Sequence, residues 1–426
     1  MDLVKTRRYF HSHPESGWFT FFTSCKIASF MQNLGFEISL GDKIVDKNYM
    51  QGVGSDKEKE EAIKRAKTLL TQEEQKFLSP MIEFAQTGVV ADIDTGRKGK
   101  FTAFRFDIDS VDVCERKDEN HHPVKENFRG DVDFCMHACG HDGHITIGLA
   151  LAEKIIQNLG KFNGKFRFIF QTAEEGTRGA VGMEKAGVVD GVDYLFGGHI
   201  GFQAKENRML ICQTNKFLAT SKFDVYFKGI SAHAAGAPQD GANALLAAAN
   251  AALLMHAITR NANGVTRINV GKLIAGEGRN VIAPNGFLAC ETRGETTQLN
   301  EFMYEKAMEI VKGVSIAHGV EYEVKLTGGT AGGDSSDEVG EIYEECAKES
   351  ELIDNDKIIK KLDFGACEDF AHLMSKVQSQ GGKSGYLMIG TKLSAGHHNC
   401  GFDFDEKALE VGVDIFYKAA LKVNKA

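Results

Sequence analysis

The sequence predicts a protein of the α/β class, with a doubly wound and mostly parallel sheet into which a smaller α+β domain is inserted. Two observations favour this fold class. Strand-like apolar runs alternate with helical segments in the first half of the chain, and strands of period 2 take over after about residue 217. A length of 426 residues is enough for two or three domains. We therefore expect the larger domain to span residues 1–216 and 330–426, and the inserted domain to span residues 217–329.

The composition excludes several classes of protein. With 42% hydrophobic and 26% charged residues, the chain is neither disordered nor fibrous. A net charge of −9 argues against nucleic acid as a partner, and no apolar run approaches the roughly 20 residues that cross a membrane. The N-terminus lacks the apolar core of a signal peptide, and the nine cysteines are scattered along the chain. We expect a cytoplasmic protein without a disulfide framework.

The N-terminal region predicts a helix, a strand and a charged insertion, in that order. The apolar residues of the first 40 positions recur on one side of a helix that ends at Gly35, and a short strand follows over 36–40. Residues 56–78 are rich in charge and poor in helix breakers, which predicts an exposed helical insertion spanning about 46–80. A charge run of this kind is usually a solvated face, so no ligand is assigned to it.

Three strand-like runs each end at a polar side chain. The run FTAFRF precedes Asp107, FRFIFQ precedes Glu174, and YLFGG precedes His199. Between the first two runs, residues 144–160 carry apolar side chains at helical spacing. Strands that alternate with helices predict parallel pairing, and ligands of such sheets bind at the carboxyl ends of the strands.

The inserted domain has a pattern of its own. Strands are expected over 222–228, 265–273, 286–293 and 320–326, and helices over 241–260 and 299–318. This order is β-α-β-β-α-β, the ferredoxin-like arrangement, which can fold as a self-sufficient unit. The glycine-rich segment 328–336 lacks a following Gly-Lys-Ser/Thr, so it predicts a flexible return to the larger domain and not a phosphate loop.

The densest group of reactive side chains is the run MHACGHDGH, which contains Cys139, His141, Asp142 and His144. Residues two apart do not share a helix face, so joint binding of a metal needs a turn, and the intervening glycines permit one. The run also opens a helix, where the helix dipole favours a thiolate. Metal binding is the favoured interpretation, and a glycine-rich helix start with incidental histidines is the alternative.

Further candidate ligands follow the other strands. Adjacent carboxylates at the end of a strand point in different directions, so one of Glu174 and Glu175 can bind metal while the other moves a proton. A helix start enriched in glutamate would also contain such a pair. His199 ends the third strand, and His397 and His398 lie near the C-terminus, where a solitary histidine is more often structural.

The fold is expected to bring these side chains to one edge of the sheet. The ligands would be Cys139, His141, Glu175, His199 and one of the two adjacent histidines. Five ligands suffice for two metal ions with a shared bridging group, and such a site activates water, so hydrolysis is the predicted reaction class. Thiolate and imidazole favour zinc, whereas carboxylate and open positions allow manganese.

Other polar residues are candidates for supporting roles. Asp107 and Asp109 end a strand and can orient ligand histidines, although solvated aspartates are common there. In the inserted domain, His233 follows a strand within a loop of small residues, and Asn280 lies in a glycine-rich turn. Arg293 ends another strand, and its fork suits the carboxylate of a substrate, while a surface salt bridge is the alternative.

The motifs HACGHDGH, AEEGTRGA, GGHIG, ISAHAAG and GHHN occur in this order over nearly the whole chain. In this they resemble the di-metal aminoacylase and carboxypeptidase G group of metallopeptidases, in the branch where a cysteine replaces a metal-binding aspartate. Elsewhere in that group a histidine precedes the first strand-end aspartate, but here the position is Arg105. The loss is consistent with His141 as the replacement ligand.

The resemblance implies a role for each matched position. Cys139, His141, Glu175, His199 and His398 would hold two divalent ions, zinc or manganese, with His398 chosen because FDFDE follows it after a short spacer. Glu174 would be the general base, and Asp107 and Asp142 would support the ligands. His233 would stabilise the oxyanion, reaching across from a second copy of the chain, and Arg293 and Asn280 would hold the amino-acid end of the substrate.

The predicted activity is therefore hydrolysis of the amide bond of an N-acyl amino acid, with an aromatic acyl group on glutamate or aspartate. The resemblance implies a homodimer formed through the inserted domain, which would also act as a lid, or a complex with a related chain. A broad aminoacylase or dipeptidase is one alternative function. A non-catalytic partner subunit is another, and the presence of both Glu174 and Glu175 argues against it because a binding protein needs no free base.

Overall fold

The computed structural model describes residues 1–426, and the chain forms two compact units. The first unit comprises Met1–Asn215, Asp334–Phe364 and Asp369–Ala426. The second comprises Lys216–Gly333 together with the short segment Gly365–Glu368. The sequence did not predict that this short segment packs with the second unit, because it carries no periodicity of its own.

The first unit is built on an eight-stranded sheet with the strand order β1-β2-β4-β3-β5-β14-β6-β12. Its strands are β1 (Glu37–Ser39), β2 (Val89–Asp94), β3 (Phe101–Asp107), β4 (Lys165–Gln171), β5 (Tyr194–Ile200), β6 (Leu210–Ile211), β12 (Ile358–Ile359) and β14 (Lys383–Ile389). Strands β4, β3, β5 and β14 pair in parallel. Strand β2 pairs antiparallel with both β1 and β4, and β14 pairs antiparallel with β6. The sheet is therefore mixed, with a parallel centre, and not mostly parallel throughout.

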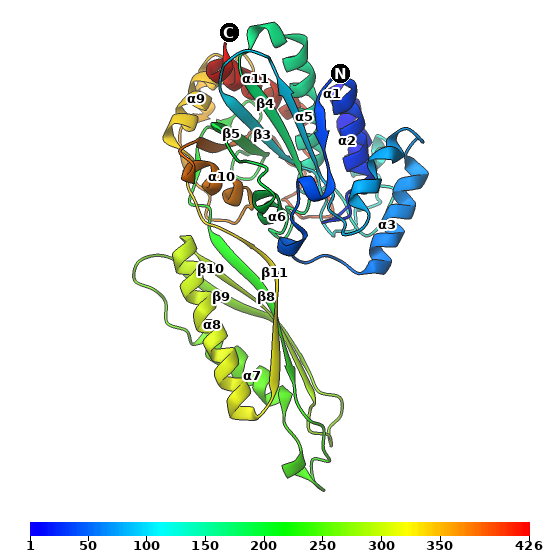
Figure 1. Ribbon diagram of the computed structural model, residues 1–426, viewed down its shortest axis with the longest axis vertical. Coiled ribbons are helices and arrows are strands. Elements are labelled where there is room, and N and C mark those ends of the chain that lie inside the picture. The colour runs from blue at the N-terminus through cyan, green and yellow to red at the C-terminus, as the bar shows by residue number, and fades with distance from the viewer. The chain divides into compact units, whose positions relative to one another are not determined.

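Helices cover both faces of this sheet. They are α1 (Leu3–His11), α2 (Phe21–Asn33), α3 (Asp56–Leu69), α4 (His122–Lys125), α5 (His141–Gln157), α6 (Ala180–Lys185), α9 (Asp337–Lys348), α10 (Phe370–Ser379) and α11 (Ala408–Asn424). Successive residues of a strand point to opposite faces of the sheet, so two adjacent residues of β5 show which helix covers each face. The ring of Phe196 contacts Tyr343 of α9, whereas a side chain at Gly197 would meet Phe370 of α10. Helices α5 and α11 pack against each other beside the strands (Figure 1).

The core between the sheet and the helices α5 and α11 is a layer of phenylalanines. Phe104 and Phe106 of β3 each pack edge-on against Phe416 of α11, with ring centroids 5.9 and 5.6 Å apart. Phe168 of β4 lies beside both strand residues and is fully buried. Buried aromatic rings of this size supply much of the apolar surface that holds a domain together, so the strand ends that carry the site rest on a rigid base.

The N-terminal region contains two helices instead of the single predicted helix. Pro14 disfavours helical backbone at the residue before it, and Gly17 adopts a φ of 53°, so the chain turns between α1 and α2. The charged insertion does form a helix, α3, which begins at a capping box made by Ser55 and Glu58. No helix combines the length and the apolar composition needed to cross a bilayer.

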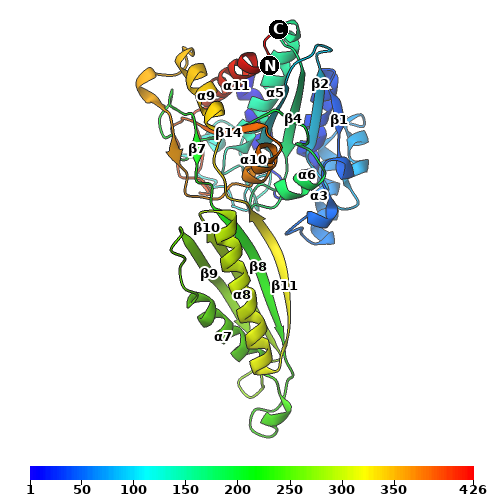
Figure 2. The ribbon, with the colours of Figure 1, turned by 60° about the vertical axis from the view of Figure 1, so that its left-hand side comes forward.

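The second unit contains a four-stranded antiparallel sheet with the order β11-β8-β10-β9. Its elements are β8 (Ala219–Lys228), α7 (Ala244–His256), β9 (Thr266–Ala275), β10 (Asn285–Gly294), α8 (Thr297–His318) and β11 (Glu321–Thr330). The chain order is the predicted β-α-β-β-α-β, and α7 and α8 pack together on the sheet (Figure 2). Alternate strand residues such as Phe223, Val225 and Phe227 form the core beneath the helices.

The remaining short strands, β7 (Thr214–Asn215) and β13 (Leu362–Asp363), pair in parallel within the first unit.

Candidate metal centre

The parallel centre of the sheet brings the predicted ligands together. Strands β4, β3, β5 and β14 are parallel neighbours, so their carboxyl ends share one edge of the sheet. Glu174 and Glu175 follow β4, His199 lies in β5, and Cys139 and His141 lie at the start of α5. The turn between these last two residues passes through Gly140, whose φ of 83° is a backbone conformation that favours glycine.

Cys139 and His199 face each other. The Cys139 sulfur lies 3.4 Å from Nε2 of His199, and Nδ1 of His199 donates a hydrogen bond of 2.8 Å to the Ile200 carbonyl. Because Nδ1 carries the proton, Nε2 has a free lone pair toward the sulfur. Burial holds the pKa of His199 well below its ordinary value, so the ring stays neutral. A neutral imidazole whose other nitrogen is bonded to a carbonyl is the form that binds metal.

His141 has a nitrogen with no hydrogen-bond partner. Its Nδ1 donates to the backbone carbonyl of Asp109 at 2.8 Å, so Nε2 is the nitrogen that remains for a metal ion. That Nε2 is buried without a hydrogen bond and lies 3.7 Å from an Asp107 oxygen and 4.0 Å from Glu175 Oε1. Since buried polar atoms nearly always have partners, this nitrogen fits a metal ligand.

Asp109 holds the loop that carries the two glutamates. One carboxylate oxygen of Asp109 accepts the backbone N–H of Glu174 at 3.0 Å, and the other accepts the N–H of Glu175 at 3.1 Å. Ala173 and Thr177, which flank the pair, have φ angles of 53° and 60°, in the left-handed region. Non-glycine residues adopt this conformation at a cost, and such strain concentrates at functional sites. The sequence suggested that Asp109 orients ligand histidines, whereas its bonds to the loop of the two glutamates depend on the tertiary structure.

The two adjacent C-terminal histidines differ in their contacts. Nε2 of His398 lies 3.3 Å from Glu175 Oε1, and the His398 backbone N–H donates to the Ala138 carbonyl at 2.8 Å. His397 instead donates from Nε2 to the Ile200 carbonyl at 3.1 Å. Its ring stacks on Phe202 with centroids 4.2 Å apart. His398 is thus the histidine that the structure brings to the candidate ligands.

The donor atoms form two groups that share one residue. Cys139, His141 and His199 make one group, and Cys139, Glu175 and His398 make the other, each with its donor atoms within 4.8 Å of one another. A thiolate can bind two ions at once, so Cys139 can bridge them. The donors are sulfur, nitrogen and oxygen, a set that fits zinc and also admits manganese. Glu174 lies in a further group with His141 and Glu175 and is buried.

His144, the last histidine of the motif, is already fully bonded. Its Nδ1 donates to the carboxylate of Asp107, and its Nε2 accepts the Ile200 N–H at 3.0 Å. With both ring nitrogens in use, His144 has no lone pair for a metal ion. It instead joins α5 to β3 and β5 beneath the candidate ligands.

Arg105 lies directly below this edge of the sheet. Its guanidinium bonds Asp107 at 2.7 Å and Asp369 at 2.9 Å, and only 1% of the residue is exposed. Although burial opposes ionisation of Asp107, its interactions with His141, His144 and Arg105 hold its pKa well below the ordinary value. Asp107 is therefore an anion that neutralises the buried cation and orients His144. An Asp107 oxygen lies 3.7 Å from Nε2 of the candidate ligand His141, which is farther than its 2.7 Å bond to Arg105.

The structure corrects the supporting role expected of Asp142. The Asp142 carboxylate accepts hydrogen bonds from Arg7 Nε at 2.7 Å and from His11 Nδ1 at 2.8 Å, and not from a candidate ligand. Adjacent helix residues point in different directions, so Asp142 is directed to α1 while His141 is directed to the strand ends. No local pattern in the sequence indicated Arg7 and His11, because their partners lie more than a hundred positions away.

The remaining predicted residues belong to the second unit. His233 is exposed, and its Nδ1 accepts the N–H of Gly236 at 3.0 Å. It lies near Asn280, because the Asn280 carbonyl accepts the N–H of Ala234 at 3.0 Å. Arg293 lies in β10 and pairs with Glu291 of the same strand at 3.1 Å, which is the salt bridge that the sequence left open.

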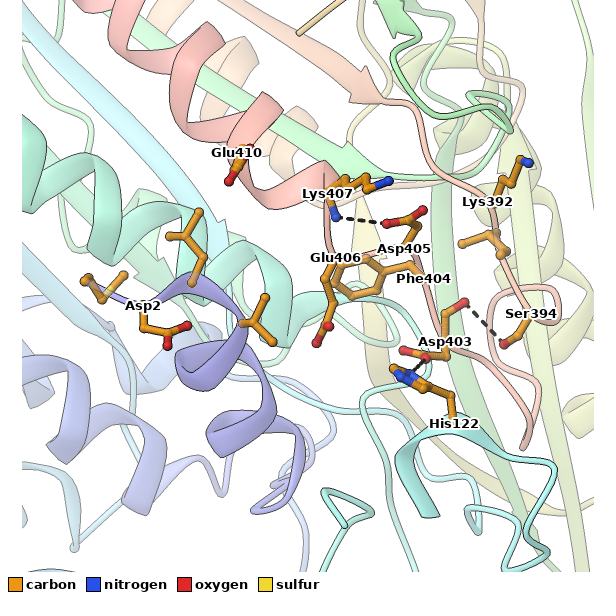
Figure 3. Close-up of a pocket in the computed structure, with 14 residues that line it drawn as sticks. Asp2, His122, Lys392, Ser394, Asp403, Phe404, Asp405, Glu406, Lys407 and Glu410 are labelled. Carbon is orange, nitrogen blue, oxygen red and sulfur yellow. Dashed lines mark hydrogen bonds and ion pairs between the residues drawn. The ribbon is translucent and has the colours of Figure 1, made fainter. Parts of the chain in front are cut away.

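A pocket of about 900 Å³ near the N-terminus contains none of the candidate ligands. It is lined by the first four residues and by segment 403–407, as Figure 3 shows. Its most buried carboxylate, Asp403, is bonded to His122 at 2.7 Å and to Arg7 at 2.7 Å. Both oxygens of this carboxylate are therefore occupied by protein partners.

Comparisons with known proteins agree with the geometry. The profile of peptidase family M20/M25/M40 matches residues 103–422. A homolog of a p-aminobenzoyl-glutamate hydrolase subunit, from Haemophilus influenzae, is 42% identical over 423 residues, 99% of this chain and 98% of that protein. An indole-3-acetyl-aspartic acid hydrolase from Enterobacter agglomerans is 40% identical over 99% of this chain and 95% of its own length. The crystal structure of an aminobenzoyl-glutamate utilization protein from Klebsiella pneumoniae superposes with a TM-score of 0.84 at 36% identity, over 98% of this chain and 95% of that one.

Proposed function

The chain belongs to peptidase family M20/M25/M40 and is an amidohydrolase, and we propose that it uses two metal ions to cleave aromatic N-acyl amino acids. The similarity of its motifs to the metallopeptidases is thereby confirmed. One observation carries the proposal of two ions. The two groups of donor atoms share Cys139, and together they use five ligands from five different positions of the chain.

The proposed ligands are Cys139, His141, Glu175, His199 and His398. The unpartnered Nε2 of His141 and the neutral ring of His199 are suited to bind an ion without rearrangement. When bound, zinc or manganese ions supply Lewis acidity that lowers the pKa of water and polarises the scissile carbonyl.

Glu174 is the proposed general base. Its backbone N–H is held by Asp109, and its carboxylate lies in one group with His141 and Glu175. In this position it takes the proton from the attacking water and then passes that proton to the leaving nitrogen of the amino acid. The adjacent Glu175 is the proposed ligand, because its Oε1 also lies 3.3 Å from Nε2 of His398.

The proposed substrates have an aromatic acyl group on glutamate or aspartate. Support comes from the names of the relatives, one a hydrolase of p-aminobenzoyl-glutamate and the other of indole-3-acetyl-aspartate. We assign His233 to the oxyanion and Arg293 and Asn280 to the amino-acid end. For Arg293 this requires that its fork exchange Glu291 for the substrate carboxylate, which is a modest cost for a half-exposed pair.

The second unit is the proposed lid and the dimer interface. Its helix α7 exposes Leu246 to 49% and Leu253 to 71%, and these residues lie two turns apart on one side of the helix. Large exposed apolar residues on one helix face mark an interaction surface. A second copy of the chain is the expected partner, and a related chain is the alternative. Light scattering of the purified chain measures the molar mass, and a monomer at micromolar concentration would contradict the homodimer.

The function is tested with the purified chain, reconstituted separately with zinc and with manganese. Release of the amino acid is followed with p-aminobenzoyl-glutamate, indoleacetyl-aspartate, N-acetyl amino acids and dipeptides. We expect turnover of the first two that a chelator abolishes. Equal turnover of all four classes would favour a broad aminoacylase. No turnover by the dimeric, metal-loaded chain would favour a protein that needs a partner chain.

A further inference from the structure

A second pocket of the first unit, of about 580 Å³, lies between the N-terminal segment 14–19 and the charged insertion. The insertion contributes residues of α3 and of the loop before it, and Arg178 closes another side. The volume falls within the range of roughly 300–1,000 Å³ that is typical of small-molecule sites. None of the candidate metal ligands or supporting residues lines this pocket.

This pocket adjoins the metal centre through shared backbone. Arg178 Nε donates a hydrogen bond of 2.8 Å to the backbone carbonyl of Glu175, a candidate ligand. On the other side, the N–H of Ser110 donates to the Glu15 carbonyl at 2.8 Å, and Ser110 directly follows Asp109. The wall of this pocket and the segments that carry Glu175 and Asp109 are therefore joined at two places.

Arg178 is fixed by hydrogen bonds to backbone carbonyls and lies beside two glycines. Its Nη1 donates to the Gly52 carbonyl at 3.1 Å, and neither of its two hydrogen-bond partners is a carboxylate. A side chain at Gly17 would lie 3.1 Å from Nη2, and one at Gly176 would lie 3.0 Å from Nε. The glycines thus leave room for a planar cation, and such cations stack favourably on aromatic rings.

The rest of the lining fits an aromatic ring with a polar edge. Phe134 is 63% exposed although it is a large apolar side chain, and Phe19 is partly exposed in the same pocket. Asp112 and Glu61 are exposed carboxylates of the lining, and each can accept a hydrogen bond from an N–H on the ring. Four carboxyl groups line this pocket against the two guanidinium groups of Arg65 and Arg178, so the carboxylates of a glutamate or aspartate are disfavoured here.

We propose that this pocket binds the aromatic acyl group of the substrate, with the ring packed on Phe134 and beside Arg178. This inference rests on the proposed function and adds the part of the protein that selects the acyl group. It also assigns a role to the charged insertion, whose helix α3 forms one wall. The amine of a p-aminobenzoyl group and the N–H of an indole both supply the hydrogen-bond donor that Asp112 and Glu61 can accept.

A binding experiment tests this proposal without any hydrolysis. Metal-free protein is titrated with 4-aminobenzamide, a neutral analogue of the acyl end, and binding is measured by calorimetry. Trp18, the single tryptophan of the chain, lines the pocket, so its emission, corrected for absorption by the ligand, reports where the analogue binds. We expect saturable binding that changes this emission. Removal of the ring in Phe134→Ala should weaken binding by about 10-fold.

Phe84→Ala is the matched control, because Phe84 is also partly exposed and lies outside this pocket. It should bind the analogue as the natural chain does. Binding that leaves the Trp18 emission unchanged, or that is equally strong in Phe134→Ala, would overturn the proposal. These outcomes are independent of turnover, so they leave the proposed function untouched.

Kinetics then distinguish the acyl end from the amino-acid end. In Phe134→Ala, the kcat/KM for p-aminobenzoyl-glutamate relative to N-acetyl-glutamate should fall by about 10-fold, and in Phe84→Ala this ratio should stay constant. If Phe134→Ala instead changes the preference between p-aminobenzoyl-glutamate and p-aminobenzoyl-alanine, the pocket binds the amino-acid end and the proposal is wrong.

Discussion

Two clusters of buried histidines and carboxylates lie in the first unit, and they differ in whether the histidine nitrogens are already bonded. In the metal-centre cluster, Nε2 of His141 has no hydrogen-bond partner. In the charge-pair cluster, which comprises Arg7, His11, Glu115, Asp142 and Asp403, His11 donates from one nitrogen to Asp142 at 2.8 Å and from the other to Glu115 at 3.1 Å. Histidine and carboxylate side chains occur in both.

The difference determines what each cluster can do. Burial disfavours a charged His11, but its hydrogen bonds to Asp142 and Glu115 outweigh this effect and raise its pKa to about 9. His11 is therefore a cation that pairs with two carboxylates and has no lone pair left. Backbone carbonyls, in contrast, accept only the Nδ1 protons of His141 and His199, so that Nε2 of each ring faces the other candidate ligands. Whether a buried histidine is a ligand thus depends on its second partner.

The largest expected effect is a loss of folding stability when the charge-pair cluster is disrupted. Arg7→Met removes the cation that Asp142 and Asp403 share, and an uncompensated buried charge costs about 3–5 kcal/mol. Denaturant unfolding followed by circular dichroism measures this loss. The matched control is Arg8→Met, because Arg8 is partly exposed and pairs with Glu406, so about 1 kcal/mol or less should be lost. Equal losses in the two variants would contradict the description of the charge-pair cluster.

The next effect concerns catalysis at the metal centre. Glu174→Gln keeps the size of the side chain but removes the base, so turnover should fall by about 10²-fold or more while the metal content stays the same. An activity assay measures the turnover, and mass spectrometry of the protein measures the metal content. Glu184→Gln in α6 is the control and should retain both. Full activity in Glu174→Gln would remove it as the general base.

Loss of the sulfur that the two donor groups share should act on metal content instead. Cys139→Ser replaces a thiolate that is shared by both groups of donors, so fewer than two ions per chain should remain after dialysis. Cys135→Ser alters a cysteine that is also buried but lies in neither group, and it is expected to keep the metal content. Unchanged content in Cys139→Ser would exclude it as a ligand.

A smaller effect is expected from the residue that orients the ligands. Asp109→Asn keeps one oxygen for the N–H of Glu174 or Glu175 but loses the other, and such partners of ligands typically contribute about 10–100-fold in metal affinity. Competition with a chelating dye measures this affinity. Asp118→Asn, at an exposed site, should bind metal as the natural chain does. An unaffected Asp109→Asn would show that the loop holds its shape without this carboxylate.

The last effect is a pH dependence of stability that belongs to the charge-pair cluster. The pKa of His11 is about 9 in the folded chain and near 6.5 when unfolded, so its contribution to stability is complete below pH 6.5. That contribution is lost as the pH rises through 9, by at most about 1.4 kcal/mol per pH unit. Thermal unfolding between pH 6 and 10 should show a decline that is shallower in His11→Gln. Parallel profiles in the two proteins would contradict a charged His11.

The sequence by itself determined the features that depend on local pattern. The alternation of apolar runs predicted the strands that carry the ligands, and the order β-α-β-β-α-β of the second unit follows from periodicity alone. Spacing within the run from Cys139 to His144, and the motifs around it, led to the confirmed family. These signals survive in the sequence because each arises within a few adjacent residues.

Only the tertiary structure decided how those residues are used. It distinguishes His398 from His397 and directs Asp142 to Arg7, and it occupies both nitrogens of His144. It also shows that the sheet is mixed, because pairing direction depends on which strands become neighbours. The reason is physical: a side chain's role follows from its hydrogen-bond partners, and here those partners come from positions tens to hundreds of residues away.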